Sequence, residues 1–187
     1  MIYLPERYFF AYGSLMYPNG INNRGLKYDY EQSDFITATL TNHKRGSYAV
    51  YKNQYFYSIV PNKDSAVYGM LFKVHSHYDF DKLLHDEGAS DHYRNTKEGV
   101  MYDVVDVTNK IYHCWIPMEA KVYTLVHPKH KTLKSGEMDQ WYIDNVWNGI
   151  KIHGPSFMSK FTKTGGIASG GGSRCLQQTL KKFQETV

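Results

Sequence analysis

Cysteine is scarce in this sequence, and long hydrophobic runs are missing. Only Cys114 and Cys175 occur among 187 residues, too few for a disulfide framework, so we expect reduced thiols. No apolar run approaches the ~20 residues that a membrane-spanning helix needs. Glu6 and Arg7 precede any segment that could form the apolar part of a signal peptide. These absences favour a cytoplasmic protein with no membrane partner.

An excess of charge of one sign is also lacking over most of the chain. Residues 1–150 contain 16 Lys and Arg against 17 Asp and Glu, a net of −1, whereas residues 151–187 contain 6 against 1, a net of +5. The overall charge of +4 therefore belongs to the C-terminal part. So few basic residues do not predict a nucleic-acid-binding protein. We interpret the basic tail as a solvated terminus, which leaves room for a protein partner.

Short strands separated by turns dominate the hydrophobic pattern. The run from Val67 to Val74 alternates most clearly, and Lys52-Asn53 reads as a turn between two strands. Loops are expected at residues 18–23 and 61–64, which are rich in Pro, Asn and Gly or in charged residues. The strands are expected at residues 8–12, 35–43, 47–51, 54–60, 67–74, 100–107, 112–115 and 121–126. This succession is typical of a barrel-like sheet.

Two stretches have helical spacing. Phe80, Leu83, Leu84 and Glu87 fall at i, i+3, i+4 and i+7, and Gly88 follows where a helix would stop. Asp79 or Asp81 is expected to cap its start. A second helix is expected over residues 137–150, ended by Gly154-Pro155, with a short helical turn at 156–161.

The chain is predicted to have one domain, residues 1–163, and a tail, residues 164–187. The tail begins with a Gly/Ser-rich stretch that is typical of a flexible linker. It is not a phosphate-binding loop, since no lysine follows at the required spacing. Leu176, Leu180 and Phe183 then give a weak helical stripe.

Glu87 is the leading candidate for chemistry. A carboxylate on the apolar face of a helix is desolvated, which raises its pKa, and the negative end of the helix dipole raises it further. A raised carboxylate pKa suits a general base that works near neutral pH. Asp86 lies about 100° round the helix and is expected to be solvated. The alternative is that Glu87 is a frayed terminal residue that points into water.

A second candidate site is the turn after the first strand. The apolar run Tyr8 to Tyr12 breaks into Gly13-Ser14, where glycine tolerates positive φ. Such a turn leaves backbone N–H groups unpaired, and these can converge on an anion. The alternative is an ordinary strand and tight turn. Ser14 is a weak candidate nucleophile, because no Gly-x-Ser-x-Gly elbow surrounds it.

Together these motifs resemble the gamma-glutamylcyclotransferase-like family. In that family a Tyr-Gly-Ser-Leu loop, here residues 12–15, faces one catalytic glutamate, here in Leu-x-x-x-Glu87-Gly88. The resemblance extends over residues 8–161. Further segments that follow the family's spacing are residues 58–61, 67–72, 93–94, 120–123 and 153–155.

The resemblance implies an α+β fold, a small mixed barrel-like sheet with flanking helices. It implies cyclisation of a small γ-glutamyl amine, amino acid or peptide to 5-oxoproline, with Glu87 as acid and base and with no metal or cofactor. The implied substrate-binding residues are Tyr12, Gly13, Ser14, Leu15, Tyr93 and Tyr123. Tyr93 and Tyr123 can equally be sheet tyrosines. Asp91-His92 before Tyr93 departs from the family pattern and puts the pocket rim in doubt.

Other readings stay open beside the cyclotransferase. One is a non-catalytic protein on the same fold that binds a ligand or inhibits a partner. Another is a related enzyme that removes a γ-glutamyl group from an unusual carrier. Both remain possible because one fold can host different functions. A metal site is not expected. His75 and His77, and likewise His127 and His130, lack a third ligand at convincing spacing.

Overall fold

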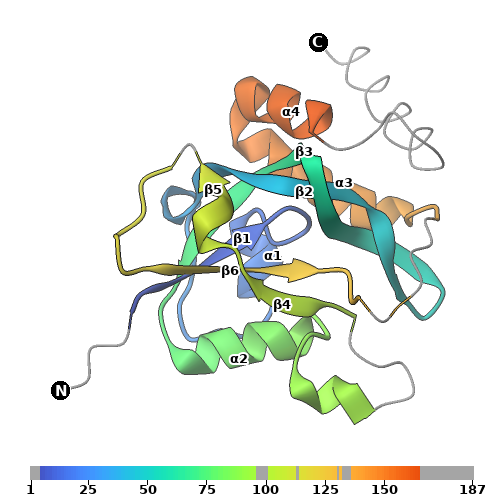
Figure 1. The fold of residues 1–187 in the computed structure, drawn as a ribbon, viewed down its shortest axis with the longest axis horizontal. Helices are drawn as coiled ribbons and strands as arrows, with labels where there is room; N and C mark the ends of the chain where they lie inside the picture. The colour runs from blue at the N-terminus through green and yellow to red at the C-terminus, as the bar shows by residue number, and fades with distance from the viewer. Residues whose placement is uncertain (1–4, 96–100, 113, 130, 132–135, 165–187) are drawn as a thin grey trace.

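The computed structural model describes residues 5–95, 101–112, 114–129, 131 and 136–164. A six-stranded mixed sheet forms its centre, in the order β4-β6-β1-β3-β2-β5, and curls into a half-barrel (Figure 1). The strands are β1 Arg7–Ala11, β2 Ile36–Tyr51, β3 Gln54–Val74, β4 Asp103–Asp106, β5 Ile111–Tyr112 and β6 Lys121–Val126. The predicted α+β class with a barrel-like sheet is confirmed.

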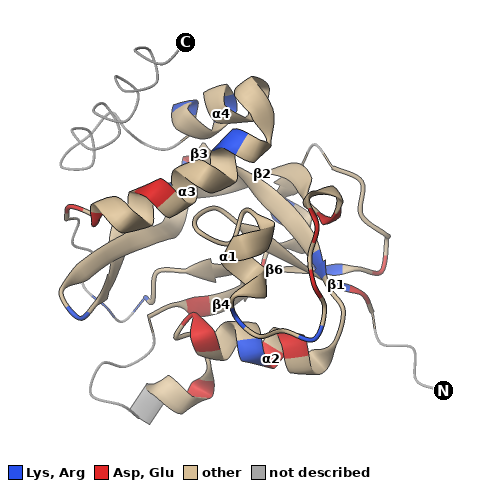
Figure 2. Ribbon diagram, turned by 180° about the vertical axis from the view of Figure 1, so that it is seen from behind, with Lys and Arg blue, Asp and Glu red and all other residues tan. Residues whose placement is uncertain are grey.

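Helices flank the sheet at two ends of the view in Figure 1, with α2 below and α3 and α4 above. The helices are α1 Pro18–Asn22, α2 His77–Asp86, α3 Gln140–Ile152 and α4 Gly154–Lys163, with 3₁₀ turns at Gln32–Asp34, Asp91–Asn95 and Thr108–Lys110. Gly154 takes a φ of +82° at the break between α3 and α4, which glycine adopts without strain. Figure 2 shows that most of the charge on α2 is acidic, whereas α4 carries basic residues.

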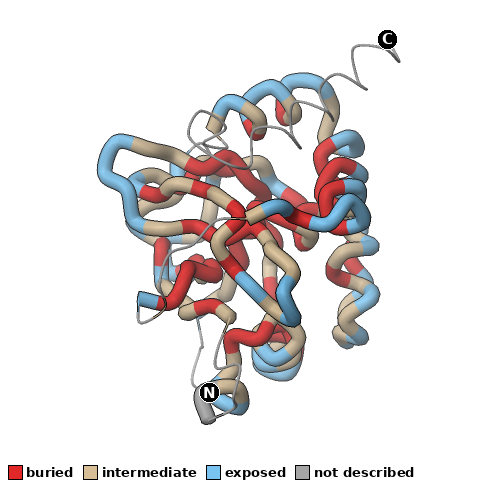
Figure 3. The backbone as a smooth tube through the Cα atoms, turned by 90° about the vertical axis from the view of Figure 1, so that its right-hand side faces the viewer, coloured by how far each residue is buried: buried red, intermediate tan, exposed pale blue. Residues whose placement is uncertain are grey.

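The strand β1 lies at the centre of the sheet, and its last three residues are buried. It pairs antiparallel with β3, where Phe9 faces Phe72, and parallel with β6, where Phe9 faces Tyr123. Phe9 and Phe10 are at most 1% exposed, consistent with the apolar run read from the sequence. Figure 3 shows buried residues along the central strands and exposed residues on the outer surface of the helices.

Two long strands replace the short strands that the sequence predicts between residues 35 and 74. β2 runs unbroken across residues 44–46, and β3 includes the predicted loop at residues 61–64. The register of the pair passes from His43–Pro61 to Thr41–Ala66, with Asn42 at φ 58°. A β-bulge of this kind absorbs turn-like residues without ending a strand, which is why the sequence pattern suggested a loop at residues 61–64, whereas residues 44–46 pair in regular register with residues 58–60.

Other boundaries also differ from the sequence prediction. The segment 18–23, expected to be irregular, contains the short helix α1, which starts at Pro18, because proline suits the first position of a helix. β4 and β5 are shorter than expected, α3 begins three residues later, at Gln140, and α4 is a ten-residue helix.

The predicted tail lies almost wholly outside the described residues. The last described residue, Thr164, still contacts the sheet, since the N–H of Tyr68 donates to its Oγ1 at 3.0 Å. The domain boundary after residue 163 and the stripe of Leu176, Leu180 and Phe183 remain predictions. Within the described part of the chain, no helix is long and apolar enough to cross a membrane.

Candidate active site

The end of α2 fixes the position of Glu87. The N–H of Ala89 donates to the carbonyl of Leu84 at 2.8 Å, and the N–H of Gly88 donates to that of His85 at 3.0 Å. Gly88 has a φ of +68°. This is a Schellman motif, with Gly88 in the left-handed conformation that glycine favours. Gly88 therefore ends the helix as predicted, and Glu87 is the residue that caps it.

The start of α2 is capped differently from the prediction. Ser76 is the N-cap, and its Oγ accepts a hydrogen bond from the N–H of Asp79 at 3.0 Å. Asp79 is buried in the first turn, where its Oδ2 accepts from Ser76 and its Oδ1 accepts from the N–H of Lys27 at 2.7 Å. Asp79 thus joins α2 to the segment that precedes β2, and Asp81 is exposed.

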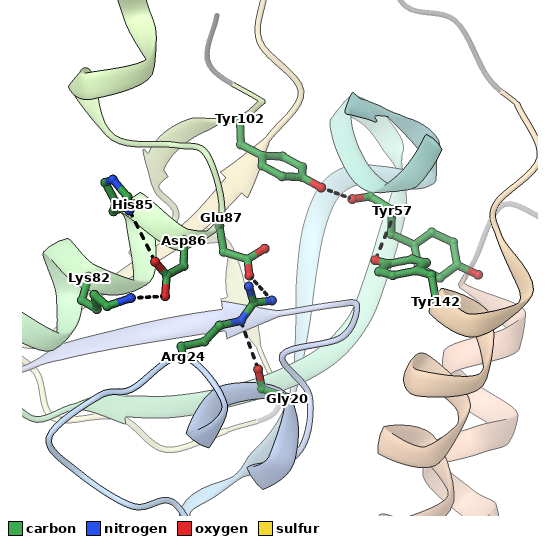
Figure 4. A network of polar contacts seen from close by, with 9 residues as sticks. All are labelled: Gly20, Arg24, Tyr57, Lys82, His85, Asp86, Glu87, Tyr102 and Tyr142. Atoms are coloured by element: carbon green, nitrogen blue, oxygen red, sulfur yellow. Dashed lines mark hydrogen bonds and ion pairs between the residues drawn. The ribbon is translucent and has the colours of Figure 1, made fainter. Parts of the chain in front are cut away.

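Glu87 is a largely buried carboxylate that lies beside a single cation. Its side chain is 14% exposed, and its Oε1 lies 2.6 Å from Nη2 of Arg24. This ion pair lacks hydrogen-bond geometry, so Oε1 has no hydrogen-bond partner among the described residues. Figure 4 shows Glu87 pointing away from Lys82 and His85, toward Arg24.

Burial raises the pKa of Glu87 above its usual range. The positive charge of Arg24 lowers this pKa in part, and the negative charge of Asp86 raises it. The burial predicted from the apolar stripe is present, so the alternative of a frayed residue in water does not hold. A raised pKa brings a carboxylate closer to the range in which a general base works.

Asp86 is not the solvated residue that the sequence analysis expected. Its side chain is 18% exposed, forms an ion pair with Lys82 and lies 3.4 Å from Nδ1 of His85. Burial would raise its pKa, but the hydrogen bonds from Lys82 and His85 outweigh burial and hold the pKa below its usual range. The pKa values of the two neighbouring carboxyl groups are therefore shifted in opposite directions, that of Asp86 downward and that of Glu87 upward.

The predicted anion-binding turn follows β1. No described residue accepts a hydrogen bond from the N–H groups of Gly13, Ser14 or Leu15, and successive unpaired N–H groups of this kind can bind an anion. The residue before them is held firmly. The hydroxyl of Tyr12 donates to the carbonyl of Leu125 at 2.6 Å, and Nη1 of Arg45 donates to the carbonyl of Tyr12 at 3.4 Å.

Gly13 does not use the conformation that the sequence suggested. The glycines with positive φ in the described chain are Gly25, Gly88 and Gly154, and Gly13 is not among them. A Cβ at Gly13 would instead lie 2.8 Å from the hydroxyl oxygen of Tyr142. The turn needs glycine because of this close approach, not because of its φ angle.

Two cavities that share lining residues are bordered by the turn after β1 and by Glu87. The larger has a volume of about 500 Å³ and the smaller about 30 Å³. Both are lined by Ser14, Glu87, Tyr102 and Tyr142, whereas the other turn residues, Tyr12, Gly13 and Leu15, line the smaller one. The larger one is also lined by Tyr17, Asn19, Gly20, Asn23, Arg24, Tyr51, Phe56, Asp86, Gly88, Tyr93, Met101, Trp141 and Asn145.

Tyr93 and Tyr123, which the resemblance assigned to substrate binding, lie in different places. Tyr93 lines the large cavity, close to His85, with ring centroids 5.4 Å apart. Tyr123 packs its ring against Phe80 at 5.2 Å and lines neither cavity. Tyr12 lines the small cavity, with its hydroxyl on Leu125. Of the predicted substrate-binding residues, only Tyr123 is therefore not brought to the site.

Sequence reasoning missed several residues of the site. Arg24 lies in a segment without periodicity, and Tyr142 adjoins a helical stripe that we attributed to the core. Tyr102 donates to the carbonyl of Tyr57 at 3.0 Å across the cavity wall (Figure 4). Arg45 is 1% exposed, and burial lowers its pKa to about 10. No signal in the sequence ties these residues to Glu87, because they come from segments distant in the chain that only the folded structure brings together.

Comparison with known proteins agrees with this arrangement. The family described as gamma-glutamyl cyclotransferase, AIG2-like, matches residues 9–142, well over half of the chain. The chain belongs to this family. The matched region includes both the turn after β1 and Glu87, so the resemblance drawn from the motifs is confirmed. Family membership points to a gamma-glutamyl cyclotransferase-like enzyme.

Solved structures share the fold at low sequence identity. YkqA from Bacillus subtilis is 16% identical with a TM-score of 0.59, over 89% of this chain and 56% of its own. A gamma-glutamyl cyclotransferase is 17% identical with a TM-score of 0.56, over 95% of this chain and 99% of its own. The human protein loc79017, described as uncharacterized, is 16% identical with a TM-score of 0.58 over the same shares. No curated protein matches the chain in sequence.

Within the described residues, no group of three His, Cys, Asp or Glu side chains is placed to hold a metal ion. The ring of His75 stacks on Tyr28 at 3.7 Å, and Nδ1 of His77 lies 3.0 Å from Nη1 of Arg7. His130, the second member of the other pair, lies outside the described residues.

Proposed function

We propose that the protein is a γ-glutamyl cyclotransferase that releases 5-oxoproline from a small γ-glutamyl amine, amino acid or peptide. The observation that carries this proposal is the buried Glu87 carboxylate, which adjoins a cavity shared with the free N–H donors after β1. The family to which the chain belongs supports the same reaction.

The reaction needs one proton carrier and one anion site. Glu87 accepts a proton from the substrate's α-ammonium, and the freed amine attacks the γ-carbonyl carbon of the same molecule. The attacking nitrogen gives up its second proton through Glu87 as the bond from this carbon to the leaving nitrogen breaks, and the leaving nitrogen receives both protons and departs as an ammonium. No covalent enzyme intermediate is required, because the nucleophile is already tethered to its target.

In this reaction the N–H donors after β1 bind a negatively charged group of the substrate. The N–H groups of Gly13, Ser14 and Leu15 bind the substrate's α-carboxylate or the oxyanion that develops on the γ-carbonyl. Arg45 holds the carbonyl of Tyr12 and so fixes the turn from behind. Tyr93 at the wall of the cavity orients the substrate.

A panel of γ-glutamyl compounds tests the proposal, with 5-oxoproline release as the readout and the Glu87→Gln variant as the control. We expect release from at least one compound and strong loss of release in the variant. If the wild type releases no 5-oxoproline but binds a γ-glutamyl compound tightly, the fold serves as a binding protein instead.

A further inference from the structure

Arg24 is the one cation among the described residues that line the large cavity. It follows α1, and its guanidinium is held by a hydrogen bond from Nε to the carbonyl of Gly20 at 3.3 Å. Its side chain is 28% exposed, and its Nη2 lies on Glu87. The Nη groups of a guanidinium carry four of its five N–H donors. Most of the donors of Arg24 therefore remain available to a ligand in the cavity.

The cavity lining places the turn after β1 and Arg24 on different sides of Glu87. Gly13 and Leu15 line the small cavity, and Arg24 lines the large one. Glu87 borders both. If the γ-glutamyl group binds at the turn, as the proposed function requires, the leaving group extends into the large cavity, on the side of Arg24.

The chemistry of the leaving group then specifies what Arg24 can recognise. Glu87 must deliver a proton to the leaving nitrogen, and Arg24 contacts that same carboxylate. When the leaving group is an amino acid, its carboxylate sits on the carbon bonded to this nitrogen. We propose that Arg24 binds this carboxylate and selects γ-glutamyl amino acids over γ-glutamyl amines. The assignment rests on the proposed function.

When substrate binds, Arg24 and Glu87 each exchange their ion-pair partner, and each charge keeps a partner of opposite sign. Without substrate, Arg24 and Glu87 neutralise each other. With substrate, the α-ammonium takes the place of Arg24 at Glu87, and the leaving carboxylate takes the place of Glu87 at Arg24. Asp86, the other acidic residue of the cavity, is already paired with Lys82 and does not repel the incoming carboxylate strongly. Paired charges avoid the desolvation penalty that a lone buried ion carries.

Two substrates that differ only in this carboxylate test the assignment: γ-glutamyl-alanine and γ-glutamyl-ethylamide. In the wild type we expect kcat/KM to favour γ-glutamyl-alanine by roughly 10- to 100-fold, the usual worth of a hydrogen bond between charged groups. Arg24→Gln should remove most of this preference, mainly by raising KM for γ-glutamyl-alanine. Arg24→Lys should restore part of it, because lysine keeps the charge but not the bidentate geometry.

A matched control removes a cation elsewhere. Lys160→Gln on α4 takes away the same charge from an exposed position outside the cavity, and the preference should not change. If the wild type does not distinguish the two substrates, or if Arg24→Gln slows both equally, the assignment is wrong although the proposed function stands.

Binding of both compounds, measured by calorimetry, separates failure of the inference from failure of the proposed function. If neither compound is turned over but Arg24→Gln abolishes a preference for binding γ-glutamyl-alanine, the cyclotransferase proposal fails and the role of Arg24 holds. Equal binding of the two compounds without turnover, or no binding of either, overturns both.

Discussion

Gly13 and Tyr142 approach so closely that a Cβ on Gly13 would lie 2.8 Å from the tyrosine hydroxyl oxygen. The same hydroxyl accepts a hydrogen bond from the N–H of Tyr57 at 3.3 Å. The turn after β1, the helix α3 and the strand β3 therefore meet at one point on the cavity wall. This contact explains the need for glycine in a turn whose φ angles any residue could adopt.

Replacement of Gly13 by alanine should lower activity more than stability. The added methyl group must displace Tyr142 or shift the turn, which costs about 1–3 kcal/mol when a packed site is overfilled and moves the N–H donors. Removal of the hydroxyl in Gly13→Ala/Tyr142→Phe should recover part of the 5-oxoproline release. Tyr142→Phe alone serves as the control. Unchanged activity in a well-folded Gly13→Ala protein would place the anion site elsewhere.

Replacement of Glu87 by glutamine should reduce kcat by about 10²–10⁴, the usual contribution of a positioned acid or base. The amide keeps the shape of the side chain and still accepts a hydrogen bond, so substrate affinity measured by calorimetry should survive. Asp86→Asn changes the neighbouring carboxylate at the same helix end and should lower kcat far less. Wild-type kcat in Glu87→Gln would rule out the proton transfer proposed for Glu87.

The rate should depend on pH through the ionisation of Glu87. The general base must be deprotonated, and burial raises its pKa, so kcat/KM should rise with pH through an apparent pKa above the ~4.3 of a free glutamate. Arg24 lowers this pKa and Asp86 raises it. Tyr12, Tyr102 and Tyr142 also adjoin the carboxylate, but burial raises their pKa values, so they stay neutral over this range.

The Arg24→Gln variant gives the sign of this electrostatic effect. Without the positive charge that lowers its pKa, Glu87 should ionise at higher pH. The acid limb of the plot of kcat/KM against pH should therefore shift to higher pH. An acid limb that stays in place, or that shifts to lower pH, would show that Arg24 does not lower the pKa of Glu87. The measurement is kcat/KM against pH for a substrate that the variant still converts.

Asp79 should matter for stability because it joins two segments. Asp79→Ala leaves the N–H of Lys27 and the hydroxyl of Ser76 without this acceptor, and a lost buried partner costs about 1–3 kcal/mol. Asp81→Ala, at an exposed position on the same helix, should stay within about 0.5 kcal/mol of the wild type. Urea denaturation compares the two. Equal losses would mean that the contacts of Asp79 contribute nothing particular.

The sequence by itself determined the central strand, the end of α2 and the place of Glu87 there. These features depend on local physics: an apolar run makes a buried strand, a 3.6-residue period makes an amphipathic helix, and Gly88 accepts a left-handed conformation. The spacing put Glu87 on the stripe of Phe80 and Leu83, but it left open a frayed residue in water, and the structure shows the side chain only 14% exposed.

Only the tertiary structure decided which groups surround Glu87. Arg24, Tyr102 and Tyr142 come from separate segments that the folded chain brings to one cavity, and no local pattern records their meeting. The same holds for β2 and β3, whose length depends on pairing across a bulge rather than on the residues of either strand. The resemblance assigned Tyr123 to the substrate site, but β6 places its ring against Phe80 and away from both cavities. Local periodicity fixes which way a side chain faces within its own element, whereas the packing of elements fixes what it meets.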